Sequence, residues 1–103
     1  MTEHEMQVKF AKMLPELLNK AFELGFEVTL GDAYRDPRVT YGHPNSLHKH
    51  RLAIDLNLFK DGRWLKASED HKLLGEWWES QGGTWGGRFK DGNHYSLAFG
   101  GMK

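Results

Sequence analysis

Hydrophobic residues recur with helical spacing over the first quarter of the chain. Between Glu3 and Leu24 the apolar side chains stand three or four positions apart, with charged and amide side chains between them. This pattern predicts an amphipathic helix that ends at Gly25. Pro15 lies inside the pattern and lacks the amide that would bond to Ala11, so we expect a kink there or two helices that meet.

Alternating apolar and polar side chains predict three strands. They cover residues 26–30, 53–59 and 93–99, and Ile54, Leu56 and Leu58 should share the buried face of the second strand. The stretch 32–45 holds two prolines and no sustained period, which predicts a surface loop.

A second helix is predicted over residues 69–80, with Ser68 as its N-cap. A hairpin turn is predicted at residues 60–63, and a glycine-rich loop at residues 84–92. Strands and helices therefore mix without regular alternation. We expect an α+β fold with a small antiparallel sheet flanked by helices.

The length and composition of the chain limit the classes of function that it can have. The 103 residues suit a single domain, residues 1–103, and 14 basic residues balance 14 acidic ones, which gives no support for nucleic-acid binding by bulk charge. The absence of cysteine excludes thiolate ligands, so any metal must be held by nitrogen and oxygen. No apolar run suits a signal peptide or a membrane span, and we expect a chain made in the cytoplasm.

The first candidate ligands are His48 and Asp55. Aspartate is a poor strand former, and Asp55 interrupts a strongly apolar strand on the face opposite to the core. The alternatives are a histidine in a surface turn and an aspartate on the exposed face of an edge strand. An unbroken strand would send two residues seven positions apart to opposite faces, so a turn or bulge in 49–52 must reset the direction if both bind one metal.

A second pair, Asp91 and His94, precedes the last strand. If the turn between them folds as one helical revolution, both side chains project to the same side. The alternatives are an ordinary turn aspartate and a satisfied strand histidine. Two imidazoles and one carboxylate leave one position of a tetrahedral zinc open for water, and a second carboxylate can serve as the base, so these residues suit a metallohydrolase.

Other polar and aromatic residues carry weaker signals. Arg35 follows the first strand, either in a salt bridge with a neighbouring aspartate or as a cation that holds a carbonyl or carboxylate. Trp77, Trp78 and Trp85 suit the core or a cleft wall, and Trp85 could line a substrate groove. The remaining histidines are weaker candidates: His4 and His71 are expected on solvated helix faces, His50 as a rival ligand, and His43 beside the cleft.

Taken in order, Ser46-x-His48 with Ala53-x-Asp55, and then Asp91-x-x-His94, resemble the zinc peptidoglycan peptidases. This family includes D-alanyl-D-alanine carboxypeptidases, D-Ala-D-Ala dipeptidases and phage L-alanyl-D-glutamate endopeptidases, and it shares a fold with the Hedgehog signalling domain. The dipeptide Tyr34-Arg35 is similar to the family's substrate arginine, and Gly83-Thr84-Trp85-Gly86-Gly87 to the loop before its last histidine.

The resemblance implies a role for each matching residue. His48, Asp55 and His94 would bind zinc, Asp91 would be the general base, and Arg35 would bind substrate and stabilise the oxyanion. Ser46 would help to bind substrate, and Trp85 is a further candidate for substrate contact. Two departures stand out: Arg51 replaces a glycine common between the first histidine and the aspartate, and Asp91 replaces a base that is often glutamate.

The implied function is zinc-dependent hydrolysis of peptidoglycan stem peptides by a monomer that neither binds nucleic acid nor enters a membrane. The aspartate at position 91 favours a phage endolysin-type endopeptidase, which would reach the wall after release from the host cytoplasm. A D-alanyl-D-alanine carboxypeptidase and a non-catalytic wall-binding module on the same fold are the alternatives.

Overall fold

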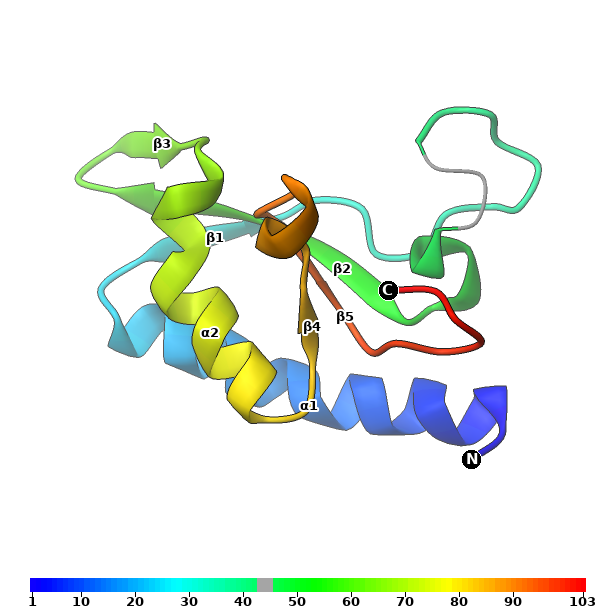
Figure 1. Cartoon of the computed structure of the whole chain (residues 1–103). Coiled ribbons are helices and arrows are strands. Elements are labelled where there is room, and N and C mark those ends of the chain that lie inside the picture. The colour runs from blue at the N-terminus through cyan, green and yellow to red at the C-terminus, as the bar shows by residue number, and fades with distance from the viewer. Residues whose placement is uncertain (43–45) are drawn as a thin grey trace.

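The computed structural model describes residues 1–42 and 46–103, and His43 lies outside the described residues. In chain order the elements are α1 (Glu3–Glu23), β1 (Glu27–Leu30), the 3₁₀ turn η1 (Leu47–His50), β2 (Ala53–Lys60), β3 (Arg63–Leu65), the 3₁₀ turn η2 (Ser68–His71), α2 (Lys72–Ser80), β4 (Thr84–Trp85), the 3₁₀ turn η3 (Gly86–Phe89) and β5 (His94–Ser96). Figure 1 shows α1 running beneath the strands and α2 standing beside them. The predicted α+β fold with a small antiparallel sheet is confirmed.

The sheet is organised around β2, its longest strand. The order is β1-β2-β5-β4, β3 also pairs with β2, and every pairing is antiparallel. The second half of β2 pairs with β1 and β3, whereas its first three residues pair with β5. In that register Asp55 stands opposite His94, so two candidate ligands from distant parts of the sequence become neighbours.

One face of β2 packs into the hydrophobic core. Ile54, Leu56 and Leu58 are buried together with side chains from both helices, among them Leu17 of α1 and Trp78 of α2. This confirms the predicted buried face. Because side chains alternate along a strand, Asp55 is directed to the other face, away from this core.

The first helix has a clear start and passes through its proline. Thr2 and Glu5 form a capping box, in which each side chain accepts a hydrogen bond from the backbone of the other. The helix continues through Pro15 as one element, so the expectation of two helices that meet there is wrong. It ends just before Gly25, as predicted. No helix within residues 1–42 and 46–103 carries an apolar run long enough to cross a bilayer.

Three sequence-based boundaries differ from the structure. The α2 helix begins at Lys72, after a 3₁₀ turn, and Ser68 does not cap it; the Ser68 hydroxyl instead accepts a hydrogen bond from Gly92 N at 3.0 Å. Thr84–Trp85 forms a strand within the predicted loop, because its backbone completes the ladder with β5. The last strand ends at Ser96, three residues earlier than predicted.

His71 is buried, so its predicted exposure is wrong. It is only 2% exposed, and the hydroxyl of Tyr95 lies 2.7 Å from its Nδ1. Tyr95 is itself fully buried on β5. The periodicity of the helix placed His71 on a solvated face because the pattern contains no information about a partner 24 residues away. His4 is exposed, as predicted.

Candidate metal centre and active site

His48 reaches the site through a sharp change of chain direction. Ser46 precedes η1 and its hydroxyl accepts a hydrogen bond from His48 N at 3.1 Å, which starts the turn. Arg51 then adopts a left-handed conformation, with φ of 59°, before β2 begins. This turn is the reset that the spacing of His48 and Asp55 requires, and the left-handed backbone at Arg51 explains why glycine suits this position.

The three candidate ligands converge. Ligand atoms of His48, Asp55 and His94 all lie within 4.8 Å of one another. His48 Nε2 is 3.1 Å from Asp55 Oδ1, and His94 Nδ1 is 3.8 Å from the same oxygen. Both imidazoles are buried, and Asp55 is partly buried. The donors come from η1, β2 and β5, and the antiparallel register of β2 and β5 fixes two of them.

The surroundings of His48 fit a cation. Its Nδ1 lies 3.1 Å from the carbonyl oxygen of Ala33, which can only accept, so Nδ1 carries the proton and donates it. In the neutral imidazole Nε2 then presents a lone pair to the Asp55 carboxylate. A lone pair of Nε2 and a carboxylate oxygen this close together require either a second proton on His48 or a metal ion bound by both. Metal-ligating histidines usually donate from their other ring nitrogen to such an acceptor, as Nδ1 of His48 does to the Ala33 carbonyl.

Electrostatics within the cluster stabilise the carboxylate. Burial acts to raise the pKa of Asp55, but the hydrogen bond from His48 and the positive charge of His48 and His94 outweigh it and lower the pKa to about 2. Burial likewise acts to lower the pKa of His48, and the hydrogen bond and charge of Asp55 raise it above the ordinary histidine value. Asp55 is therefore ionised at neutral pH, the state needed to bind a metal.

His94 fits a metal ligand for a separate reason. Its Nε2 is buried and has no hydrogen-bond partner among the described residues, while Nδ1 faces Asp55 and Asp91 at 3.8 and 3.9 Å, too far for hydrogen bonds. A buried imidazole left without a hydrogen bond costs free energy. A metal bound at Nδ1 would give that nitrogen a partner but would leave Nε2 without one. The approach of Nδ1 to the shared oxygen of Asp55 is therefore what fits a metal held by two nitrogens and one oxygen.

Asp91 stands beside this cluster, at the edge of a cleft of about 780 Å³. The turn predicted between Asp91 and His94 is present, because His94 N donates to Asp91 O at 3.1 Å and both side chains face the same side. The Asp91 side chain is 52% exposed, which lets it reach a molecule in the cleft. Gly86 approaches the Asp91 carbonyl so closely that a Cβ there would collide with it.

Arg35 lines the same cleft and is held in place. Only 8% of it is exposed, and its Nη2 donates to Asp32 Oδ2 at 3.2 Å, so the salt bridge considered from the sequence is present. Its guanidinium also lies 5.0 Å from the ring centre of Tyr41. A cation fixed on the cleft wall can still bind an anionic or carbonyl oxygen there. Ser46 lines the cleft as well.

Two other candidates lie away from the cleft. Trp85 is 4% exposed, packs in the core and donates from its indole to Gly92 O at 2.7 Å. It therefore supports the segment that carries Asp91 rather than lining the cleft. His50 bonds to Glu3 at 2.9 Å and does not join the ligand cluster.

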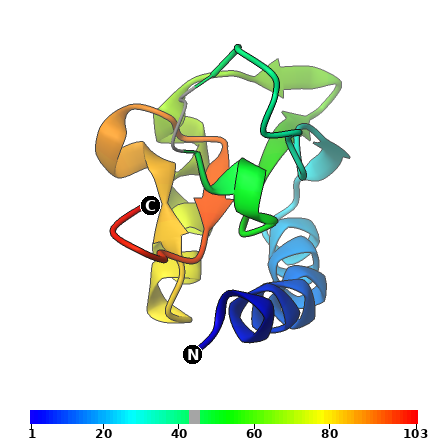
Figure 2. The ribbon, with the colours of Figure 1, turned by 90° about the vertical axis from the view of Figure 1, so that its right-hand side faces the viewer.

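The cleft has a wall that the sequence did not reveal. The cleft is also lined by Gly101, Met102 and Lys103, and Phe89 contributes an aromatic side chain. Phe99 and Met102 exchange backbone hydrogen bonds and so form a small hairpin after β5. Figure 2 shows this terminal segment looping back beside β5. A short glycine turn carries no chemical motif, so only the fold places it at the site.

Comparison with known proteins agrees with this geometry. A family model described as D-alanyl-D-alanine carboxypeptidase matches residues 40–97, more than half of the chain. The match includes the three candidate ligands and Asp91, whereas Arg35 precedes it. No curated protein matches the chain.

Proposed function

Since the chain belongs to the D-alanyl-D-alanine carboxypeptidase family of metal-dependent peptidoglycan peptidases, we propose that it uses zinc to hydrolyse a peptide bond in the stem peptides of the bacterial cell wall. The observation that carries the proposal is the convergence of His48, Asp55 and His94 beside a carboxylate and a fixed cation in one cleft. Two nitrogens and one oxygen, with no thiolate in the chain, form a donor set typical of catalytic zinc.

The ligand residues would hold the ion, and each is supported by the fold. His48 is oriented by the Ala33 carbonyl, and Asp55 and His94 by the pairing of β2 with β5. When bound, zinc supplies Lewis acidity, which lowers the pKa of water and polarises carbonyl oxygens.

Asp91 and Arg35 supply the remaining chemistry. The Asp91 carboxylate is partly exposed in the cleft, where it can accept a proton from the attacking water and later donate it to the departing amine. The Arg35 guanidinium can donate hydrogen bonds to the oxygen of the scissile carbonyl as negative charge develops on it. Ser46 orients His48 through its backbone and is close enough to the cleft to contact substrate.

We propose an endopeptidase that cuts between L-alanine and D-glutamate, as in phage endolysins, because the resemblance at Asp91 is to that branch. On this proposal the monomer is made in the host cytoplasm and acts on the wall after release. The description of the matching family favours a second candidate, a D-alanyl-D-alanine carboxypeptidase, in which Arg35 would bind the terminal carboxylate. A non-catalytic wall-binding module would need neither Asp91 nor Arg35 in the cleft.

Digestion of purified peptidoglycan, followed by mass analysis of the products, tests these candidates. An endopeptidase releases stem peptides from the glycan, a carboxypeptidase releases only free D-alanine, and a binding module releases nothing. His48→Ala should abolish release, and His4→Ala, on the exposed side of α1, is the matched control. Full activity of His48→Ala would contradict the proposed site.

A further inference from the structure

A second cavity, of about 250 Å³, adjoins the catalytic cleft. Asp91 lines both cavities, whereas Arg35 lines only the larger one and Lys66 and Lys90 line only the smaller one. A molecule bound next to Asp91 can therefore extend into either. The proposed mechanism gives the smaller cavity no role.

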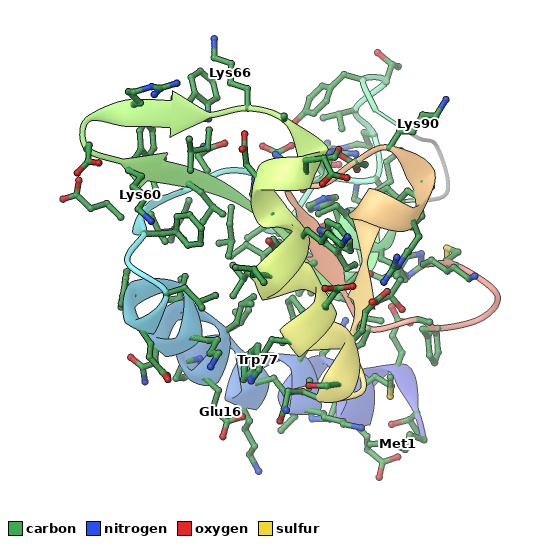
Figure 3. The ribbon with its side chains drawn as sticks, turned by 60° about the vertical axis from the view of Figure 1, so that its left-hand side comes forward. Met1, Glu16, Lys60, Lys66, Trp77 and Lys90 are labelled. Carbon is green, nitrogen blue, oxygen red and sulfur yellow. The ribbon has the colours of Figure 1, made fainter. Side chains whose placement is uncertain are left out.

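The smaller cavity carries two cations with no carboxylate partner. Within the described parts of the chain neither Lys66 nor Lys90 forms an ion pair, and Asp91 is the one acidic residue on the wall. Figure 3 shows both lysines projecting from the same side of the molecule, Lys66 beyond β3 and Lys90 at the end of η3. The lining thus has an excess of positive charge.

The position of Lys66 is restrained by aromatic packing. Its Nζ lies 4.6 Å from the ring centre of Trp64, which is a cation–π contact. Trp64 in turn stacks on Phe59, with ring centres 6.1 Å apart and planes 25° apart. The indole is therefore held by its stacking on Phe59 and in turn supports the lysine.

Lys90 and the floor of the cavity are fixed by the backbone. Lys90 has a φ of 63° and ends η3. The following residues are tied down on both sides, because Asp91 N donates to Gly86 O at 2.8 Å and Gly92 N donates to Ser68 Oγ at 3.0 Å. The cavity is therefore lined by β2, β3, η2 and the segment that follows η3, and its shape does not depend on one loose side chain.

We propose that this cavity, which shares Asp91 with the cleft that Arg35 lines, is a carboxylate-binding subsite for an acidic residue of the peptide substrate. Two lysine ammonium groups attract a carboxylate, and the amides of Asn57 and Asn93 on the same wall can donate further hydrogen bonds. The inference rests on the proposed function for the identity of the substrate. A peptide that meets cations in both cavities would have acidic groups at two positions.

Kinetics with paired peptides test the subsite. The substrates are a stem peptide with a free side-chain or α-carboxylate beside the cut and the same peptide with that group amidated. In the double variant Lys66→Met/Lys90→Met we expect KM for the acidic peptide to rise about tenfold with kcat unchanged. The KM for the amidated peptide should be the same in the variant and the wild type. The control Lys9→Met/Lys12→Met removes two charges from exposed positions of α1 that line neither cavity.

A binding measurement separates this inference from the proposed reaction. Calorimetric titration of the same proteins with an acidic γ-glutamyl dipeptide needs no hydrolysis. If the wild type cleaves peptidoglycan but the lysine variant keeps the same KM for both peptides, the subsite is overturned and the reaction stands. If the wild type binds the dipeptide through these lysines without any hydrolysis, the subsite stands and the reaction fails. The subsite is also overturned if the wild type does not bind the dipeptide, or if the lysine variant binds it as tightly as the wild type does.

Discussion

Asp55 and His94 face each other across β2 and β5, with Asp55 Oδ1 3.8 Å from His94 Nδ1. The contact joins residues 39 positions apart, and the backbone ladder holds them together without a hydrogen bond between the side chains. His48 completes the group from the turn that precedes β2. Each ligand is thus placed by a different local cause, and a metal would act on a site that the fold has already assembled.

Asp91→Asn should separate catalysis from metal binding. The amide keeps the size of the side chain but cannot accept a proton, so kcat for a stem peptide should fall by about 10²- to 10⁴-fold. The zinc content should not change, because Asp91 lies outside the ligand cluster. Steady-state kinetics and metal analysis of the same preparation check both parts. A variant that loses its zinc would show that Asp91 is a ligand rather than the base.

The stability of the protein should fall between pH 6.5 and 4 because of His71. Burial lowers the pKa of His71 to about 4. In the unfolded chain the same imidazole takes up a proton near pH 6.5, so acidification through this window favours the unfolded state. The loss attributable to His71 is about 3 kcal/mol when complete.

Urea unfolding of the wild type and His71→Leu at several pH values checks this assignment. The leucine variant should lose less stability than the wild type over the same window, whatever its stability at pH 7. Tyr95→Phe is a useful companion, because it removes the hydroxyl that bonds to His71 but keeps the ring. Equal pH dependence in the wild type and His71→Leu would rule out His71 as the cause.

Arg51→Gly should change the free energy of unfolding little. The left-handed conformation costs a non-glycine residue about 1–2 kcal/mol, which glycine avoids. However, the substitution also removes the contact of the Arg51 guanidinium with the Tyr34 ring, 4.0 Å away, worth about 0.5–1 kcal/mol. The two effects oppose each other, and the net change should lie within about 1 kcal/mol.

Arg51→Val provides the contrast, because a β-branched residue is strained at this φ and makes no cation–π contact. It should unfold at clearly lower denaturant concentration than either the wild type or the glycine variant. Denaturation curves that do not distinguish valine from glycine would show that the backbone at this position is not constrained as described.

The local sequence predicted the elements in which apolar residues recur at a regular interval or in which the separation of two candidate ligands restricts the chain direction. The α1 helix, the buried face of β2 and the turn between His48 and Asp55 follow from alternation, capping and the odd separation of two ligands. The β4 strand was missed, since two residues among glycines show no period and become a strand only by pairing with β5.

The side-chain environment was harder to predict because it depends on distant partners. Burial of His71 requires Tyr95, and the position of Trp85 requires the carbonyl of Gly92. The hairpin wall of the cleft and the lysine-lined cavity carry no motif at all. The roles of Arg35 and Ser46 remain predictions, although both residues line the cleft.

Metal content measured together with thermal stability tests the central claim most directly. We predict one zinc per chain for the wild type, none for Asp55→Ala, and a full complement for the control Asp61→Ala, which lies in the β2–β3 turn. Zinc at a hundred times its Kd should stabilise the wild type by about 2.7 kcal/mol and leave the melting temperature of Asp55→Ala unchanged. Equal zinc content and equal stabilisation in Asp55→Ala would contradict the account.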